Sequence, residues 1–506
     1  MKMNYIEVLS KSELQAIHSA TMELLATIGI KVDAKDTQEL FKEHGAEINS
    51  ETNFVKIPES LVREQLKRVP NSFKLYGADV SFNFEVNTHD VQFATIGTPV
   101  KIYDPSTKGE LRKTILEDTI KQIRVVDSLE HIVNSHVDVW PNDIKYTAIH
   151  AHCMYQWAKN TRKPYGLGCY GKIASQDMIN MASIVAGGDD ELIEKPRLVG
   201  FFNPTSPLQL PQIMTNGLSV FAKYKQPTIV APEALAGTSA PVTLAGLLTQ
   251  TNAEILSGIV LAQLFNSGAP VFFGTVSIIT DMRSGNSAMG SIETGLITAG
   301  IAQLARYYKI PSRGLGGVTD SKVFDLQNGI ERMQTLMLAA QAGINYITCA
   351  GTYEATLVEA LELLVVDDEL AGMVKRALEG IAVNENTIGL DVIKKVATSG
   401  KTGVNYLSES HTREHLKREL YIPKLLDRNR RTTWQKKGAK DIIVVAREKI
   451  EQILKNFTPP DLPKDVEERL LAYIKDVEQR SLDYYRQAEG ISAKSVSLPG
   501  IDVKIE

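Results

Sequence analysis

Eight short apolar runs recur along the middle of this 506-residue chain, and they constrain its fold more than any other feature. Each interval between them is long enough for one helix and two loops. Continuous apolar runs that alternate with amphipathic helices are typical of parallel strands buried on both faces. The pattern predicts an α/β fold built as a closed (β/α)8 TIM barrel, although an open doubly wound sheet remains an alternative, because periodicity does not show closure. The runs are Val91–Gly97, Ile132–Val139, Pro164–Tyr170, Arg197–Asn203, Pro227–Glu233, Ala269–Val276, Ile310–Gly317 and Ile344–Gly351.

The segments on either side of these runs have a different pattern. Residues 1–90 predict an N-terminal helical cap, since Leu14 and Ile17 begin a helical apolar spacing that Gly29 ends. Residues 91–355 then form the barrel core, and 356–458 a C-terminal helical region with many basic residues. Pro459 and Pro460 mark a break before a last helix and tail in 459–506.

The composition excludes several classes of protein. A hydrophobic fraction of 43% and a net charge of −4 are ordinary for a globular protein and give no basic field for nucleic acid or an anionic membrane. No apolar run is long enough to span a bilayer. Three cysteines (Cys153, Cys169 and Cys349) are too few for a disulfide framework, so we expect free thiols and a cytoplasmic location.

Polar and aromatic side chains gather where the predicted strands end. In a TIM barrel these positions meet at one face, which carries the ligand site. The sequence therefore predicts an enzyme with a small-molecule site there. The candidates are Asp104, His136, Asp138, Trp140, Cys169, Tyr170, Phe202, Asn203, Glu233, Thr275, Ser277, Arg313, Asp320, Lys322, Tyr353 and Glu354.

A glycine-rich turn, Gly314-Leu315-Gly316-Gly317, follows the seventh run. Turns of this kind bind phosphate in many barrels, although a tight loop would have the same sequence. One alternative function is therefore a lyase or aldolase that acts on a phosphorylated metabolite.

The stretch from His411 to His415 has the H-x-x-E-H spacing of inverted zinc peptidases, with Glu414 as the base. Such an enzyme needs a third protein ligand, and the surrounding charged segment offers no obvious one. A zinc peptidase is a second alternative, but helical His-Glu-His clusters are more often simply hydrogen-bonded. We therefore predict no metal site.

Several motifs occur in series: Ala240–Gly246 after Glu233 and Gly237, Asp281–Gly285, Gly316–Lys322, Val366–Glu369, His411–His415 and Leu425–Arg428. The N-terminal segment adds His44–Glu47 and Val55–Pro58. Together they resemble the trimethylamine methyltransferase family over nearly the whole chain up to Phe457.

This resemblance implies a (β/α)8 barrel that moves a methyl group from a methylated amine to cobalt(I) of a separate corrinoid protein. It also implies that no cofactor is tightly bound by the chain itself. One branch of the family uses pyrrolysine, which this sequence lacks; the stretch Cys349–Glu354 is ordinary. The resemblance is therefore to the non-pyrrolysine branch, which acts on quaternary amines such as glycine betaine, proline betaine or carnitine.

The strand-end positions can be assigned roles on this reading. Losing a methyl group releases a neutral tertiary amine, so no general acid is needed. Aromatic faces suit an N-methyl head, and a betaine carboxylate needs a cation. We expect Trp140, Tyr165, Phe202 and Tyr353 around the head, Glu233 near the ammonium, Arg313 or Lys322 at the carboxylate, and Gly316, Gly317 and Asp320 against the corrinoid. We also expect a homo-oligomer.

Overall fold

The computed structural model describes residues 5–97, 99–107, 110–136, 139–400 and 405–490. Eight parallel strands close into a barrel, and each predicted apolar run supplies one of them. The ring closes where β19 pairs with β6, Tyr346 opposite Gln92. The predicted barrel is confirmed and the open sheet is wrong. The strands are β6 Gln92–Ala94, β9 Ile132–His136, β10 Tyr165–Gly168, β11 Leu198–Phe202, β13 Thr228–Val230, β15 Val271–Gly274, β18 Ser312–Leu315 and β19 Tyr346–Thr348.

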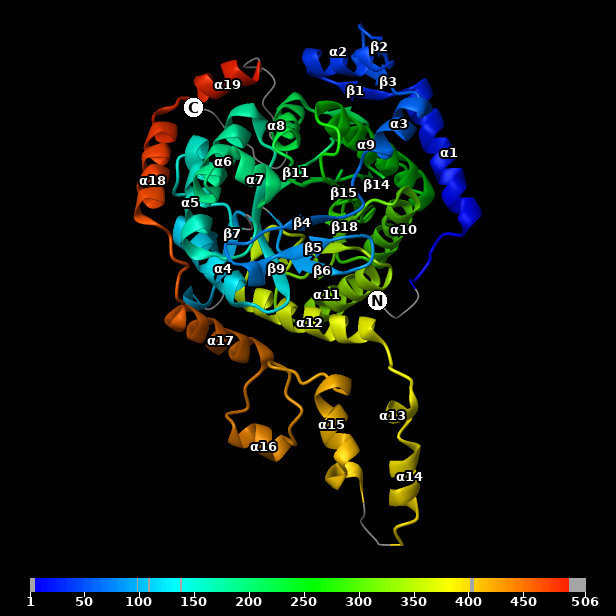
Figure 1. The fold of residues 1–506 in the computed structure, drawn as a ribbon, viewed down its shortest axis with the longest axis vertical. Coiled ribbons are helices and arrows are strands. Elements are labelled where there is room, and N and C mark those ends of the chain that lie inside the picture. The colour runs from blue at the N-terminus through cyan, green and yellow to red at the C-terminus, as the bar shows by residue number, and fades with distance from the viewer. Residues whose placement is uncertain (1–4, 98, 108–109, 137–138, 401–404, 491–506) are drawn as a thin grey trace.

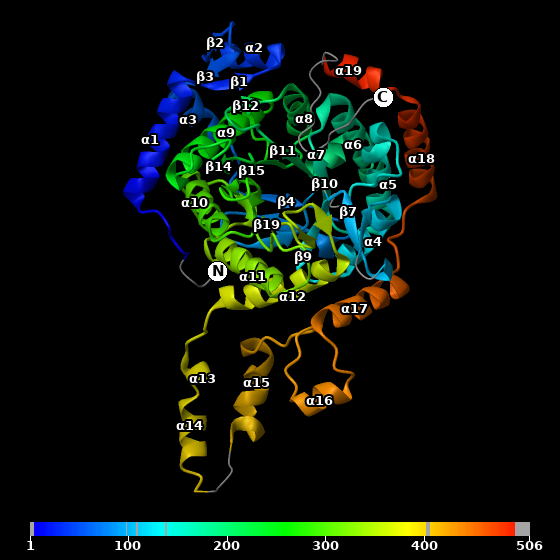
Figure 2. The same cartoon turned by 180° about the vertical axis from the view of Figure 1, so that it is seen from behind.

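A ring of helices surrounds the strands (Figures 1 and 2). They are α4 Leu116–Ser128, α5 Ile149–Asn160, α6 Gly171–Ala186, α8 Gln212–Lys223, α9 Leu244–Phe265, α10 Ile292–Tyr308, α11 Leu326–Gln341 and α12 Leu361–Glu379. The sequence contains no unbroken apolar run long enough to span a bilayer. In the described part of the chain one helix, α9, is nevertheless long enough and apolar enough in mean hydropathy to cross one, because the mean includes the few polar residues that interrupt its apolar ones. In the structure 78% of its apolar window is buried inside the protein. That burial is what a helix packed against the barrel requires.

The N-terminal segment is joined to the barrel by both helices and strands. Its helices are α1 Lys11–Thr27, α2 Lys35–Glu43 and α3 Glu59–Leu66, and its strands are β1 Ile30–Val32, β2 Glu47–Asn49 and β3 Phe54–Lys56. A capping box between Ser10 and Glu13 starts α1, which packs with α3 on α9. Strand β1 also pairs in parallel with β12 (Gln209–Leu210), which lies in the loop after β11. The cap is therefore built onto the barrel wall.

A hairpin of β4 (Phe73–Leu75) and β5 (Phe84–Val86) closes one end of the barrel. Its buried side chains pack with Phe272 and Tyr346, which point inward near the starts of their strands. The Phe73 ring meets Phe272 edge-on, with the centroids 5.0 Å apart. The N-terminal end of the barrel is thus filled by apolar side chains, and the opposite end carries the loops.

Two small sheets made from those loops stand beside the open end. One contains β14 Leu235–Ala236, β16 Ile278–Thr280 and β17 Ser287–Ala288. The other joins β20 Thr352–Tyr353 and β21 Val358–Glu359 to β7 Lys101–Asp104 and β8 Glu110–Lys113. The sequence pattern did not predict either sheet, because their strands are only two to four residues long.

The C-terminal region leaves the barrel and then returns to it (Figure 1). Helices α13 Glu385–Ile388, α14 Leu390–Ala397, α15 Ser410–Glu419 and α16 Arg431–Lys436 stand outside the body, and α17 Ile442–Asn456 packs back onto α12 and α4. The predicted last helix is two helices, α18 Lys464–Gln479 and α19 Leu482–Glu489, because Ser481 caps a new start. The tail predicted beyond Gly490 lies outside the described residues.

Candidate active site at the barrel mouth

Alternation along β11 decides which side chains reach the barrel interior. Phe201 packs with interior residues such as Ile229 and Tyr346, whereas Phe202 lies in the outer layer between strands and helices. A Cβ on Gly258 of α9 would come within 3.0 Å of the Phe202 ring, so that ring is held against the helix. Phe201, and not the predicted Phe202, therefore faces the site.

Arg313 on β18 places a guanidinium inside the barrel. It is only 1% exposed and lies 5.2 Å from the centroid of the Phe201 ring. Its Nη1 donates to the carbonyl of Thr275 at 2.6 Å, and its Nη2 donates to Oγ1 of Thr348. Burial lowers the pKa of Arg313, and within the described part of the chain no carboxylate lies within ion-pair distance of it. The interior thus holds a cation with only neutral hydrogen-bond partners.

His136, at the end of β9, lies near the Arg313 guanidinium, and its imidazole is uncharged. Its Nε2 is 2.9 Å from the hydroxyl of Tyr346. Burial and the nearby Arg313 lower the pKa of His136 to about 3. Its ring occupies the space that a Cβ on Gly166 would fill, since that atom would lie 2.8 Å from the imidazole. At neutral pH the imidazole is therefore a neutral hydrogen-bonding group.

Three aromatic rings form one side of the mouth. The ring of Trp140 is 6.0 Å from Tyr170 and 6.3 Å from Tyr146, which lies in the 3₁₀ turn Tyr146–Ala148. The Tyr170 ring folds over Gly168 of β10, where a Cβ would lie 2.3 Å from it. The carbonyl of Trp140 accepts a hydrogen bond from Oγ1 of Thr114, which fixes the loop. These aromatic faces are suited to a cationic, methylated head group.

Glu233 supplies a carboxylate just after β13. Its side chain is exposed to solvent, yet the surrounding protein desolvates the carboxyl group and raises its pKa. Attraction to Arg313 acts in the opposite direction and lowers that pKa. The carboxyl group is therefore largely surrounded by protein, although solvent still reaches the side chain. The mouth therefore contains a carboxylate and, deeper, a guanidinium.

Three of the predicted aromatic contacts lie elsewhere. Tyr165 stacks on Trp157 with centroids 4.9 Å apart in the outer layer, and Phe202 lies in the same layer. Tyr353 is 1% exposed and packs against Phe324 within the small sheet of β20 and β21. Of the aromatic residues nominated from sequence, only Trp140 is at the mouth.

The turn after β18 is shaped by packing. A Cβ on Gly316 would lie 2.5 Å from Ile347, and Gly317 has a left-handed backbone with φ of +74°. Both carboxylate oxygens of Asp320 accept backbone N–H groups, from Met289 and Gly290. These contacts account for the two glycines and for Asp320 without a phosphate or a corrinoid.

Lys322, the other cation nominated for a carboxylate, is exposed and donates to the carbonyl of Asp320 at 2.6 Å. Arg313 is thus the buried cation of the two. Asp138 lies outside the described residues.

The H-x-x-E-H stretch lies on α15, away from the barrel. The rings of His411 and His415 are 4.4 Å apart, and Nε2 of His411 is 2.9 Å from the carbonyl of Asn386 on the neighbouring segment. Among the described residues no group of three His, Cys, Asp or Glu side chains is arranged to hold a metal ion. The histidine pair instead connects two segments of the chain.

A closed barrel with aromatic and charged side chains at the C-terminal ends of its strands defines an α/β-barrel enzyme. The family model for trimethylamine methyltransferase matches residues 1–481. A trimethylamine methyltransferase of Desulfitobacterium hafniense is 36% identical over 466 residues, which cover 92% of this chain and 93% of that protein. A glycine betaine methyltransferase of the same species is 34% identical over 470 residues, which cover 92% and 96%.

The chain therefore belongs to the trimethylamine methyltransferase family, as its motifs indicated, and is an amine methyltransferase. Among solved structures, the monomethylamine methyltransferase of Methanosarcina barkeri is 14% identical with a TM-score of 0.45, covering 89% of this chain and 96% of that one.

Proposed function

We propose that this enzyme demethylates a betaine, a quaternary amine that carries a carboxylate, and passes the methyl group to cobalt(I) of a separate corrinoid protein. The observation that carries the proposal is the arrangement of charge in the mouth: Glu233 at the recess and the buried guanidinium of Arg313 deeper inside. A zwitterion offers a cation to Glu233 and a carboxylate to Arg313. Trimethylamine has no carboxylate for Arg313 and no permanent positive charge for Glu233. Glycine betaine, proline betaine and carnitine share this chemistry.

The cationic head is held at the outer part of the recess. The Trp140, Tyr146 and Tyr170 rings present π-faces, each of which contributes about 0.5–2 kcal/mol to binding a desolvated cation. The carboxylate reaches Arg313, whose forked guanidinium suits two-point recognition of a carboxylate. The methyl groups then point out of the barrel, toward the acceptor.

The reaction needs no proton transfer from the protein. The bond from nitrogen to one methyl carbon breaks, its electron pair stays on nitrogen, and a neutral tertiary amine leaves. The cobalt(I) centre of the partner supplies the electron pair for the new bond to carbon. The neutral His136 and the buried Arg313, whose Nη1 and Nη2 are hydrogen-bonded and whose Nε has no partner among the described residues, fit a site that orients the substrate instead of donating protons.

The site must also favour the transition state. Positive charge on nitrogen is lost as the methyl group departs, so a tight ion pair to the ammonium would hold back the reaction. Aromatic faces and a single, partly desolvated carboxylate hold the cation less tightly than two ionised carboxylates would. We further propose a cytoplasmic location, which the buried thiols of Cys153, Cys169 and Cys349 support, since none of them forms a disulfide.

The test mixes the purified enzyme with cobalt(I) cobalamin and, separately, glycine betaine, proline betaine, carnitine, choline or trimethylamine. Formation of methyl-cobalt(III) is followed by absorbance, and dimethylglycine, N-methylproline or norcarnitine is measured as the product. We expect at least one carboxylate-bearing amine to react faster than choline and trimethylamine. Turnover of trimethylamine alone, or of none of the five, contradicts the proposal.

A further inference from the structure

The described residues 381–400 and 405–440 form an arm that stands clear of the barrel. Helices α13 and α14 run outward and α15 returns, with α16 on a separate loop, and both views show this arm beside the body and in the plane of the helix ring (Figures 1 and 2). No described residue of α13, α14, α15 or α16 is buried. A segment of this length without a core of its own is unusual for a folded chain.

The arm is nevertheless held in place at its base. The carboxylate of Glu369 on α12 accepts the backbone N–H groups of Lys424 and Leu425. Arg376 of the same helix donates to the carbonyls of Gly380 and Glu419, where the arm leaves and rejoins the body. The direction of the arm is thus set by buried or half-buried contacts at its base.

The two legs of the arm are also tied to each other. Lys395 pairs with Glu409 at 2.7 Å, and His411 contacts the carbonyl of Asn386. Val392 and Val396 of α14 are half-buried, whereas Leu390 and Ile393 are 52% and 44% exposed. The helix therefore has one apolar side turned toward its neighbouring leg and a second that faces solvent.

Charge distinguishes the arm from the body. Residues 381–440 contain 13 Lys and Arg against 6 Asp and Glu. The rest of the chain is acidic, with 43 Lys and Arg against 54 Asp and Glu. A basic arm and an acidic body attract each other when they belong to different copies, and twofold pairing lets both arms make the same contact.

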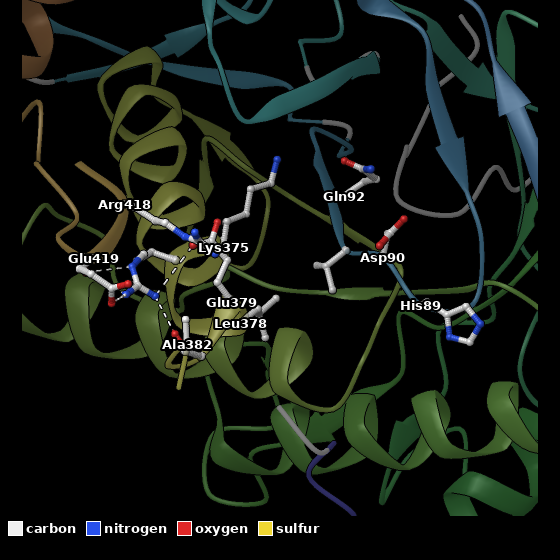
Figure 3. Close-up of a pocket in the computed structure, with 12 residues that line it drawn as sticks. His89, Asp90, Gln92, Lys375, Leu378, Glu379, Ala382, Arg418 and Glu419 are labelled. Atoms are coloured by element: carbon white, nitrogen blue, oxygen red, sulfur yellow. Dashed lines mark hydrogen bonds and ion pairs between the residues drawn. The ribbon is translucent and has the colours of Figure 1, made fainter. Parts of the chain in front are cut away.

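The angle between arm and body leaves room for such a contact. A cavity of about 680 Å³ lies there, between α12 and the end of α15 on one side and the start of β6 on the other (Figure 3). Lys375 and Leu378 reach it from α12, Arg418 from α15, and Asp90 from the segment just before β6. It has both apolar and charged side chains at its surface, like the edge of a protein–protein interface.

We propose that the arm docks on the body of a second copy of this chain, so that two copies exchange arms around a twofold axis. The exposed apolar side of α14 is covered by the partner, and the basic charge of the arm meets the acidic body. The arm runs sideways from the barrel (Figure 1), so we expect both mouths to stay open in the dimer.

The test is the mass of the full-length protein in solution, measured by sedimentation over a wide range of concentration. We expect a dimer that dissociates as salt is raised, since screening weakens contacts between exposed charges. The double variant Leu390→Asp/Ile393→Asp should weaken dimerisation about tenfold or more. The matched control is Val323→Asp/Leu326→Asp, which changes two exposed apolar residues of the body (59% and 78% exposed) and should leave the dimer intact.

Two results overturn the proposal. One is a wild-type protein that is monomeric at every concentration. This result overturns the proposal even if the arm variant binds a corrinoid protein less tightly, because the partner of the arm is then that protein and not a second copy. The other is an arm variant with the mass of the wild type. Demethylation with free cobalamin, measured on the same samples, reports on the proposed function separately, because the arm residues lie outside the mouth.

Discussion

Arg313 contributes a charge that the described part of the chain does not pair with a carboxylate, although the residue is almost fully buried. Arg313→Met keeps the length of the side chain and removes the charge. We expect kcat/KM for the betaine to fall by roughly 10²–10³, because a buried charged contact to a carboxylate is lost. Choline, which has no carboxylate, should be affected far less. Steady-state kinetics with both substrates measure the ratio.

The control is Lys322→Met, which makes the same charge change on an exposed lysine. Its kinetics should match the wild type. Equal losses for betaine and choline in Arg313→Met, with a lowered melting temperature, would mean that the arginine acts only through the carbonyl of Thr275 and the hydroxyl of Thr348.

Glu233 predicts a pH dependence. Burial in the recess raises its pKa above 4.5, so its negative charge is lost as the pH falls through that raised value. If the carboxylate attracts the ammonium, KM for the betaine rises on the acidic side while kcat changes little. The variant Glu233→Gln should have the high KM at all pH values and no acidic limb. A wild-type KM that is flat across this range would remove Glu233 from the site.

Single positions also show why the site was only partly predictable. Trp140, Glu233 and Arg313 follow from their place at strand ends, and Tyr170 and His136 were strand-end candidates without an assigned role. Phe201 was missed in favour of Phe202 because an uninterrupted apolar run does not say which of two neighbours points inward. Tyr165 was misplaced for the same reason. Only the partners of each ring, such as Trp157 and Gly258, decide.

At the scale of elements, Lys163 connects α4 to β9. Its Nζ donates to the carbonyls of Val126 and Leu129 at the end of α4 and to that of Ile132 at the start of β9. Burial lowers the pKa of Lys163 to about 8. Lys163→Met should lower the free energy of unfolding by about 1–3 kcal/mol at pH 7, because buried carbonyls lose a donor.

The pH dependence of this effect has a definite sign. Between pH 8 and 10.5 the unfolded lysine holds its proton more often than the folded one, so the stability from this group rises with pH. The gap between wild type and Lys163→Met should therefore widen from pH 8 to 10. Chemical unfolding at several pH values measures it, with the exposed Lys101→Met as the control. A gap that narrows contradicts the assignment.

The elements themselves divide into those that pattern predicts and those that it does not. All eight barrel strands were found, since burial on both faces leaves a continuous apolar run in the sequence. The sheets of β14, β16 and β17 and of β7, β8, β20 and β21 are too short to leave one. The cap was treated as a separate layer, but its hairpin β4–β5 fills the barrel, a contact between distant segments that local pattern does not contain.

At the scale of the whole molecule, the C-terminal end is fastened beside the mouth. The carboxylate of Glu489 in α19 accepts the first N–H groups of α6, from Lys172 and Ile173, directly after Tyr170. A carboxylate is favoured there by the helix dipole. Glu489→Gln should lower the hydrogen-exchange protection of 482–489 and of the start of α6 by about tenfold.

Mass spectrometry of exchanged peptides measures this change. Asp483→Asn, on the same helix, changes a carboxylate that is 77% exposed and lies 3.4 Å from Arg486, and it should leave the protection unchanged. Equal protection in wild type and Glu489→Gln would show that α18 alone fastens the C-terminal segment, through the pairing of Arg480 with Asp177.

The hairpin β4–β5 fills the N-terminal end of the barrel with apolar side chains, so the C-terminal end is the one left for a substrate to enter and leave. If the enzyme passes a methyl group from a betaine to a corrinoid protein docked at that end, as we propose, then substrate and product share one passage with the docked partner. The amine must arrive before its acceptor closes the passage, and the demethylated product leaves only after the acceptor has gone. On the proposed function we therefore expect strictly sequential turnover, and we expect an excess of acceptor to slow the enzyme by blocking the entry of substrate.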